Sequence, residues 1–431
     1  MSKFPSTPLA ELKAQGRYSM VGGPFGSKLV SRDYVESGVP VIRGGNLPFG
    51  RRFSFEDMVY VTEEKVEADL AGNLAFPGDI VVTQRGTLGQ VGLIPEDSPH
   101  SKFVVSQSQM KLTVDRSKAD PLFVYYALKS PVGQHEIHSR AITAGVPHIN
   151  LSLFQKLQMP MPPLPIQRKI VAILSAYDDL IENNNRRIKL LEEMAQRIYR
   201  EWFVDFRYPG HESVPLVDSE LGPVPEGWAA QTLGDSCSLM QAGGTPSRGN
   251  PRYWTDGTVD WFKTTELQDG FLQASREKVA EAAIKDRKTR VFPKGAILMA
   301  IYGSPTVGRL GVLTEPGACN QAALAMVGCT IPQVVLYYAL TELRTHFNSI
   351  AQGAAQQNIS KQKVEETLVV CPPTELCKLA ENFIAPMWEQ QKTLSLVNSR
   401  LQGGRNILLP RLISGEIDVT NLDIAMPEAV A

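Results

Sequence analysis

The sequence repeats itself once, in two copies that lie about half a chain apart. Residues 74–94 read LAFPGDIVVTQRGTLGQVGLI, and residues 290–313 read RVFPKGAILMAIYGSPTVGRLGVL. Later landmarks keep the same order, namely a Tyr-Tyr-Ala-Leu run (125–128 and 337–340) and a Pro-Pro pair (162–163 and 372–373). Solenoid repeats are only roughly 20–50 residues long, so this period indicates two copies of a whole domain. Two similar domains can present two similar surfaces about a pseudo-two-fold axis, which suits a target with two halves.

The composition is that of an ordinary globular protein. The chain has 431 residues, 43% of them hydrophobic and 21% charged, which suggests about two or three domains with cores of their own. No apolar run approaches the roughly 18–20 residues of a membrane helix, and the N-terminus has no signal-peptide core. The five cysteines form no C-x-x-C pair and indicate neither a zinc site nor a disulfide framework. We therefore expect a protein of the reducing cytoplasm.

The charge balance limits what the chain could do with nucleic acid by itself. Its formal net charge is −1, and residues 1–160 hold 17 Lys and Arg against 15 Asp and Glu. A DNA-binding domain that acts alone usually carries a clear basic excess, because phosphate contacts dominate its affinity. Either the chain does not bind DNA, or partners supply much of the contact to phosphates.

Two long helices are predicted, one after each Pro-Pro pair. In the first copy, short β-like runs such as VPVIRG (39–44) and a helical segment near residues 121–130 precede the proline connector. The pattern then changes to an apolar stripe with steps of three or four, which predicts a helix about 55–60 Å long. Its members are Ile166, Ile170, Ile173, Tyr177, Leu180, Asn184, Ile188, Leu191, Ala195, Ile198 and Trp202.

The second stripe is weaker than the first. Pro386 and the Gly403-Gly404 pair interrupt it, so we expect a kink or fraying there. Pro410 is expected to end the main rod or to begin a short terminal helix. The stripe consists of Leu376, Leu379, Phe383, Met387, Gln390, Leu394, Val397, Leu401 and Leu408.

An apolar stripe of this length is not stable in water without a partner, so we expect the two helices to pair. A helix that leaves the first domain and a helix that returns from the second pair most simply antiparallel. We therefore predict an α+β fold of two similar mixed α/β domains, separated by a long antiparallel two-helix coiled coil and related by a pseudo-two-fold axis. The predicted boundaries are 1–163 (first domain), 164–207 (first helix), 208–373 (second domain), 374–420 (second helix) and 421–431 (C-terminal tail).

The motifs of catalysis are missing from the sequence. GGPFGSK (22–28) and GGTPS (243–247) lack the Gly-Lys-Ser/Thr of a phosphate loop, and no G-x-G-x-x-G stands at a strand-to-helix turn. The Pro-Pro pairs lack the flanking residues of an adenine methyltransferase motif, and Glu63-Glu64-Lys65 lacks the Pro-Asp of a nuclease. The six histidines stand at no metal-ligand spacing. We interpret the chain as a protein that binds a target rather than an enzyme.

Several segments resemble the specificity subunits of type I restriction–modification systems. The segment SELGPVPEGW (219–228) is similar to the opening of the second target-recognition domain in that family. The Phe76–Ile80 turn, Gly243–Ser247, Asn358–Ser360 and the closing LLPRLISGEIDV (408–419) also resemble it. The resemblance covers roughly residues 1–420 and includes the two-copy organisation, and their shared order is more specific than any single motif.

The resemblance implies a non-catalytic DNA-reading subunit. Each recognition domain would read one half of a bipartite site in double-stranded DNA, and the coiled coil would set the unread gap. Two methyltransferase (modification) subunits would dock near Arg186–Arg200, and restriction subunits that translocate and cut DNA would join them. Cofactors would be absent from this chain, because the methyltransferase subunits would hold S-adenosylmethionine for adenine methylation and the restriction subunits would use ATP and Mg²⁺.

Base edges are read by side chains such as Arg, Lys, Gln, Asn, Ser and Thr that project from loops. Corresponding loops of the two copies carry such side chains but differ in chemistry, as expected if each copy reads a different half-site. The candidate DNA-binding residues are Lys28, Arg43, Asn46, Gln84, Arg85 and Thr87 in the first copy, and Lys263, Thr264, Thr265, Tyr302, Ser304, Thr306 and Arg309 in the second.

Two other functions remain open at this point. The chain could be a scaffold that binds no DNA, in which two protein-interaction domains are held apart by the coiled coil. It could also be a fragment of a methyltransferase–specificity fusion, which the missing methyltransferase motif argues against. An adjacent reading frame with an adenine methyltransferase motif would favour the specificity subunit.

Overall fold

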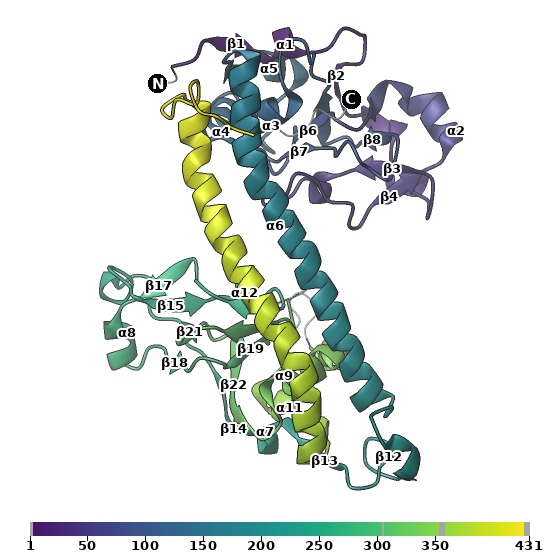
Figure 1. Cartoon of the computed structure of the whole chain (residues 1–431), viewed down its shortest axis with the longest axis vertical. Coiled ribbons are helices and arrows are strands. Elements are labelled where there is room, and N and C mark those ends of the chain that lie inside the picture. The colour runs from purple at the N-terminus through teal and green to yellow at the C-terminus, as the bar shows by residue number, and fades with distance from the viewer. Residues whose placement is uncertain (1–2, 304–305, 353–357, 426–431) are drawn as a thin grey trace. The chain divides into compact units, whose positions relative to one another are not determined.

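The computed structural model describes residues 3–303, 306–352 and 358–425 (Figure 1). The chain forms two compact units, one of residues 1–183 with 399–431 and one of residues 184–398. Each unit contains a globular domain and a stretch of both long helices. No helix in the described part of the chain is long and apolar enough to cross a membrane.

Two four-stranded sheets form the centre of the first domain. One is antiparallel, in the order β2 (Met20–Gly22), β9 (Gln109–Leu112), β6 (Ile80–Thr83) and β7 (Val91–Leu93). The other has the order β4 (Val59–Val61), β3 (Val39–Ile42), β8 (Phe103–Val105) and β5 (Leu74–Ala75), with β3 parallel to β8. Every residue of β3, β6, β8 and β9 is buried, and most are the apolar types expected of strands covered on both faces.

One buried helix packs with these sheets. Helix α3 (Pro121–Lys129) begins where the Asp120 carboxylate accepts hydrogen bonds from the backbone of Leu122 and Phe123, at 2.9 and 3.3 Å. Its residues 123–128 are all buried and belong to the domain core. The other elements are α1 (Leu9–Leu12), α2 (Glu63–Lys65), α4 (Pro131–Ser139), α5 (Leu151–Gln155), the paired strands β1 (Ser6–Pro8) and β10 (Gln158–Pro160), and the short turns η1 (Gly26–Lys28), η2 (Ser31–Asp33), η3 (Gly44–Asn46), η4 (Val66–Leu70) and η5 (Ala71–Asn73).

The second domain is built in the same way. Its larger sheet has the order β14 (Cys237–Ala242), β22 (Ala323–Cys329), β19 (Ile297–Ala300), β20 (Leu310–Leu313) and β16 (Phe271–Leu272). Its other sheet has the order β17 (Glu277–Val279), β15 (Val259–Phe262), β21 (Gly317–Cys319) and β18 (Val291–Phe292). Two strand pairs complete it, β13 (Ala229–Thr232) with β23 (Leu368–Cys371) and β11 (Leu216–Val217) with β12 (Val224–Pro225). Its helices and turns are α7 (Leu233–Ser236), α8 (Glu281–Lys285), α9 (Gln333–Glu342), α10 (Arg344–Ile350), α11 (Lys361–Glu365), η7 (His211–Ser213), η8 (Pro251–Tyr253) and η9 (Thr264–Glu266).

The strand orders confirm the predicted duplication. The order β2-β9-β6-β7 recurs as β14-β22-β19-β20, and the parallel pair β3–β8 recurs as β15–β21. Even an isolated bridge is repeated, since Arg85 pairs with His148 in the first domain and Tyr302 pairs with Asn358 in the second. The second domain differs by the added edge strand β16 and the β11–β12 hairpin. The sequence therefore predicted two similar mixed α/β domains correctly.

The two long helices are α6 (Leu164–Tyr199), which continues into the π-helical turn η6 (Arg200–Val204), and α12 (Thr374–Ile413). They pack antiparallel, because Asp178 meets Arg405 in the first unit and Asn184 meets Asn398 in the second. The Asn398 Oδ1 accepts a hydrogen bond of 2.9 Å from Asn184 Nδ2, and both side chains are buried. A buried asparagine pair in a helix seam is satisfied in only one register, so this pair fixes how the two helices align in the second unit.

The expected breaks in the second helix do not occur. α12 is helical from Thr374 through Pro386, Gly403-Gly404 and Pro410 to Ile413, so the expectations of fraying and of an end at Pro410 were wrong. A side-chain Cβ at Gly404 would meet the Tyr177 ring at 3.3 Å, so the glycine allows close packing on α6. Such packing, together with the burial of Trp388 and Leu412, offsets the weak helix propensity of these positions.

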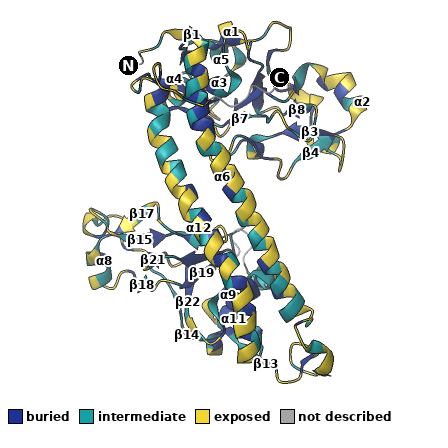
Figure 2. Ribbon diagram, viewed as in Figure 1, coloured by how far each residue is buried: buried dark blue, intermediate teal, exposed yellow. Residues whose placement is uncertain are grey.

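The buried face of α12 also differs from the predicted stripe. Phe383 is 52% exposed, as is Leu180 on α6, and exposed residues line both helices (Figure 2). Most of the buried positions of α12 lie one residue C-terminal to the predicted stripe. They include small and polar side chains, which a search for large apolar residues overlooks. Between Thr374 and Asn398 they are Cys377, Ala380, Ile384, Trp388, Gln391, Leu394 and Asn398, and Leu412 and Ile413 are buried near the end of the helix.

The structure contains one disulfide, although the cysteine spacing indicated none. Cys237 on β14 and Cys329 on β22 lie directly opposite in the sheet register, and their sulfur atoms are bonded. The two cysteines are separated by 92 residues, so only the strand pairing brings them together. Cys319, Cys371 and Cys377 are free.

Candidate nucleic-acid interface

The candidate residues of the first domain lie on loops at one end of its two sheets. The loops that follow β2, β3, β6 and β8 are joined by backbone hydrogen bonds at this end. The Ser106 amide donates to Ile42 O at 3.0 Å, the Gly23 amide to Gln109 O at 2.7 Å, and the Gln84 amide to Ser108 O at 2.8 Å. Loops distant in sequence therefore form one continuous surface, which we call the loop end.

Two glutamines hold these loops together. Gln107 Nε2 donates to the carbonyl oxygens of Gly26 and Leu29 at 2.6 and 2.8 Å, and Gln84 Nε2 donates to Gln107 O at 2.7 Å. The amide of Gln84, one of the candidate readers, therefore supports the loop that carries Lys28. Lys28 itself is exposed.

Arg43 and Asn46 form a turn after β3. Asn46 is 2% exposed, its Oδ1 accepts from the Arg43 amide at 2.9 Å, and its Nδ2 donates to Ser54 O and Glu56 O at 3.1 and 3.0 Å. An amide committed in this way shapes the turn and is not free for a base. Arg43 is half-buried, and its Nη2 donates to Asp57 O at 2.6 Å.

Arg85 and Thr87 are accessible, like Lys28. Both are exposed in the loop between β6 and β7, and Arg85 forms an isolated bridge with His148. The Gly86 amide donates to Pro147 O at 3.2 Å, which places the loop of residues 142–148 beside them. No ion pair of Arg85 or Lys28 exists in the described part of the chain, so both can present a positive charge to a ligand at the loop end.

The second domain presents the equivalent loops. Lys263, Thr264 and Thr265 follow β15, and the Lys263 amide donates to Glu266 Oε2 at 3.0 Å, as the Arg43 amide does to Asn46. Tyr302 is 38% exposed, and Thr306 Oγ1 bonds the carbonyl oxygens of Tyr302 and Gly303 at 3.0 and 2.8 Å. Arg309 lies at the start of the return to β20, and Ser304 lies outside the described residues.

An arginine that sequence reasoning missed stands among these loops. Arg248 forms two hydrogen bonds with the Glu277 carboxylate, at 2.7 and 3.0 Å, and lies 3.9 Å from the Trp254 ring centroid. Lys263 forms an ion pair with the same carboxylate. Hydrogen bonds from Arg248 and Lys263 lower the pKa of Glu277 to about 2. The signal in the sequence was weak, since it consisted of a single basic residue after GGTPS and two tryptophans.

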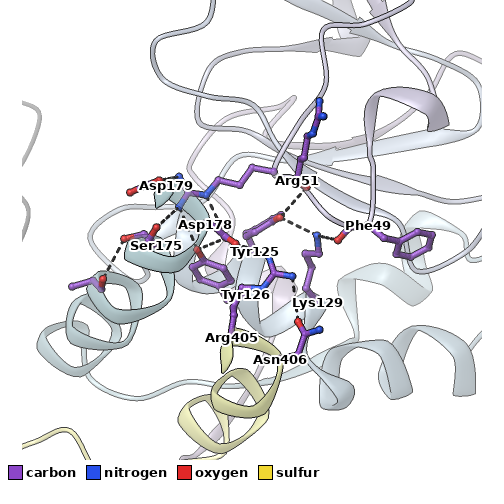
Figure 3. A network of polar contacts seen from close by, with 12 residues as sticks. Phe49, Arg51, Tyr125, Tyr126, Lys129, Ser175, Asp178, Asp179, Arg405 and Asn406 are labelled. Carbon is purple, nitrogen blue, oxygen red and sulfur yellow. Dashed lines mark hydrogen bonds and ion pairs between the residues drawn. The ribbon is translucent and has the colours of Figure 1, made fainter. Parts of the chain in front are cut away.

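A buried polar network joins the first domain to both long helices within the first unit (Figure 3). Asp178 of α6 accepts from Arg405 of α12 at 2.5 Å and from the Tyr126 hydroxyl at 2.7 Å, and Arg52 Nε lies 3.7 Å away. The Lys129 Nζ donates to Phe49 O at 2.8 Å, and burial together with the charge of Arg405 lowers its pKa to about 8. The network fixes the domain on the helix pair.

The second domain is attached through the equivalent tyrosine of its Tyr-Tyr-Ala-Leu run and through a separate ion pair. The Tyr338 hydroxyl donates to Glu192 Oε2 of α6 at 3.0 Å, and burial raises the pKa of Glu192. Arg200 Nε also forms an ion pair with Glu342 at 2.7 Å. In the described residues no group of three or more His, Cys, Asp or Glu is placed to hold a metal ion.

Comparison with known proteins identifies the family. The family profile of the type I restriction modification DNA specificity domain matches residues 31–193 and 225–385. The MjaVIII specificity subunit of Methanocaldococcus jannaschii is 30% identical over 335 residues, which cover 75% of this chain and 76% of the relative. The MjaIX specificity subunit of the same organism is 22% identical over 396 residues, 88% of each chain.

The fold has a counterpart among solved structures. The type I restriction–modification S subunit from M. genitalium aligns with a TM-score of 0.56 and 17% identity, covering 96% of each chain. That similarity concerns the fold, whereas the profile match extends over most of the sequence, once in each copy. The chain thus belongs to the type I restriction–modification DNA specificity family, as a non-catalytic specificity subunit with two target-recognition domains and no cofactor of its own.

Proposed function

We propose that each domain reads one half of a bipartite site in double-stranded DNA and that the paired helices set the unread gap. The observation that carries this proposal is a repeated framework with divergent loops. Strand order and hydrogen-bonded bridges recur in both domains, whereas Arg85 of one copy stands where Tyr302 stands in the other. The shared strand framework would give each domain a DNA-reading surface at the same place. The side chains that differ between the two surfaces would give each domain its own sequence preference. The domains proposed for this division are residues 1–163 and 208–373. The proposed spacer segments, 164–207 and 374–420, contain α6 with η6 and α12, and α12 ends at Ile413 rather than at residue 420.

The loop end of each domain is the proposed surface for the major groove. In the first domain Lys28, Arg85 and Thr87 are exposed and would contact DNA, with Arg43 beside them. In the second, Thr265, Tyr302 and Arg309 offer hydroxyl and guanidinium groups. Asn46, Gln84 and Thr306 are engaged with the protein backbone and would support these loops rather than read bases.

The partners proposed for this chain are two methyltransferase subunits, joined by restriction subunits in the complete system. The near-neutral charge of the chain supports DNA binding in which partner subunits supply many of the phosphate contacts, because a protein that binds DNA alone would need a larger excess of basic residues. Leu190 and Met194 lie one helical turn apart on α6 and are 59% and 52% exposed, which suits a docking site for a methyltransferase subunit. This assembly would act in the cytoplasm, where the chromosome lies.

Footprinting of the purified complex with its methyltransferase subunits tests the proposal. Two protected DNA segments at a constant spacing are expected. R85A should reduce discrimination in one half-site by about 1–3 kcal/mol per lost base contact and leave the other half-site unchanged. R116A is the matched control, because Arg116 follows the opposite end of β9, is exposed and pairs with Glu96. A complex without sequence-specific protection would favour a protein-binding scaffold and contradict the proposal.

A further inference from the structure

A cluster of polar and aromatic contacts holds the Arg248 side chain at the loop end of the second domain. The Glu277 carboxylate accepts from both terminal nitrogens, Nη1 at 2.7 Å and Nη2 at 3.0 Å. One face of the guanidinium covers the Trp254 ring at 3.9 Å, and the Trp261 ring centroid is 5.1 Å away. A two-point hydrogen bond and a stacked ring fix both the position and the plane of the group.

The tryptophans are themselves held in place. Trp261 is 2% exposed, and its Nε1 donates to Gly244 O at 2.9 Å. Trp254 Nε1 donates to Ser247 O at 3.1 Å, on the residue before Arg248, and the two rings meet edge to face at 5.1 Å. The loop that carries Arg248 is thus tied to the aromatic pair on which its side chain lies. Little side-chain entropy remains to be lost when Arg248 meets a ligand.

The cluster is both anchored and accessible. The Arg248 side chain keeps 49% of its surface exposed, and only two of its five N–H groups donate to Glu277. An open pocket of about 520 Å³ lies beside it, lined by Pro251, Trp254, Thr255 and Lys278 together with Arg248 and Glu277. The remaining N–H groups can therefore meet a ligand that approaches the loop end.

The first domain has no such cluster at the corresponding positions. Gly23 and Gly243 are equivalent, because the amide of each donates a hydrogen bond to the first residue of the neighbouring strand, Gln109 of β9 and Ala323 of β22. Lys28 and Arg248 each lie five residues after that glycine and therefore occupy corresponding positions. In the strand register, Trp261 corresponds to Val41 and Glu277 corresponds to Val59. The framework is shared, but the anchored arginine belongs to the second domain alone. It is thus placed to distinguish what the two domains read.

We propose that Arg248 is a specificity-determining residue of the second domain that donates two hydrogen bonds to O6 and N7 of a guanine in the major groove, with Glu277 and Trp254 as its positioning residues. This inference rests on the proposed function. The two parallel N–H donors of an arginine guanidinium match the O6 and N7 acceptors of guanine. A phosphate contact fits the cluster less well, because Glu277 adds a negative charge that opposes binding to the DNA backbone, whereas a base reader gains from the fixed orientation.

The test is to determine the DNA motif that the complete complex methylates, for the wild-type protein and for R248A, R248K, E277Q and R252A. R248A and R248K should each lose roughly 5- to 150-fold discrimination at one G·C pair in the half-site of the second domain, with the other half-site and the gap unchanged. E277Q should lose part of the discrimination at the same pair. R252A should behave as wild type, because Arg252 lies four residues away, is 66% exposed and pairs with Asp286.

Two results would overturn the assignment while leaving the proposed function intact. One is a two-part motif that both R248A and R248K leave unchanged. The other is a loss of binding that is uniform for all sequences in R248A and restored by R248K, which would mark a phosphate contact. A wild-type complex that writes no two-part motif would instead overturn the proposed function, and the assignment of Arg248 with it. R248K keeps the charge and the packing of the stem, so it tests the assignment even if R248A folds poorly.

Discussion

Inserting one helical heptad into both α6 and α12 is expected to lengthen the unread gap of the DNA site without changing either half-site. Suitable positions are after residue 183 in α6 and after residue 398 in α12, which is where the two units meet in the sequence. Insertion at both positions keeps Asn184 paired with Asn398 within the second unit and Asp178 paired with Arg405 within the first. The local register of each unit is thereby preserved.

The size of the effect follows from helix geometry. Seven residues add about 10.5 Å of helix, and one base pair spans about 3.4 Å along a strand. The gap should therefore grow by up to about three base pairs, because bending of DNA or helices can absorb part of the added length. Sequencing of methylated adenines in a host that carries the variant measures half-sites and gap together.

The matched control for the insertion is a seven-residue insertion in an exposed loop away from the loop ends, for example next to Asp97 after β7 in the first domain, which changes chain length but not the helices. That variant should keep the gap. An altered half-site with an unchanged gap in the helix variant would contradict the role of the paired helices as a spacer.

D178N is expected to destabilise the first unit by about 3–5 kcal/mol, the range for breaking a buried ion pair by removing one partner. Asp178 is 11% exposed and lies against Arg405 and Arg52, which are 14% and 21% exposed. Asparagine keeps the shape of the side chain but removes the negative charge, so these partly buried cations lose their compensation. The nearby Lys129 would lose a favourable charge as well.

The measurement is the free energy of unfolding of the first unit, taken from the slowest-exchanging amides of α3. D179N is the matched control. Asp179 also pairs with Arg52, at 2.9 Å, but its side chain is 62% exposed, so its loss should cost less than about 1 kcal/mol. Equal effects of D178N and D179N would show that the network does not secure the domain on the helices.

The parts of the fold that local patterns encode could be predicted from the sequence. Buried strands such as Ile80–Thr83 and the 36-residue helix α6 follow from runs and periods of apolar residues. The face of α12 could not be found in this way, because Ala380, Gln391 and Asn398 are buried while the larger Phe383 is exposed. Which face is buried depends on the partner helix rather than on the residue types alone.

The candidate site was predictable in position but not in detail. The Arg85 loop and the Lys263 loop could be named from polar side chains between strands, and both lie at the loop ends. Asn46 is an equally plausible DNA-binding residue by sequence, but its side-chain amide is hydrogen-bonded to the protein backbone and is not free to contact a base. Arg248 was missed because its anchor, Glu277, is 29 residues away and reaches it only through the pairing of β15 with β17. Contacts of this kind depend on tertiary structure, which no spacing rule supplies.

Exchange of one recognition domain is the most direct test of the account that the two domains read separate half-sites. Residues 1–163 are replaced by the corresponding domain of a relative, and the methylated adenines of the host genome are sequenced. We expect one half of the motif to change while the other half and the gap stay as they were. A motif that is unchanged by this exchange, and also by deletion of the whole chain, would contradict this expectation.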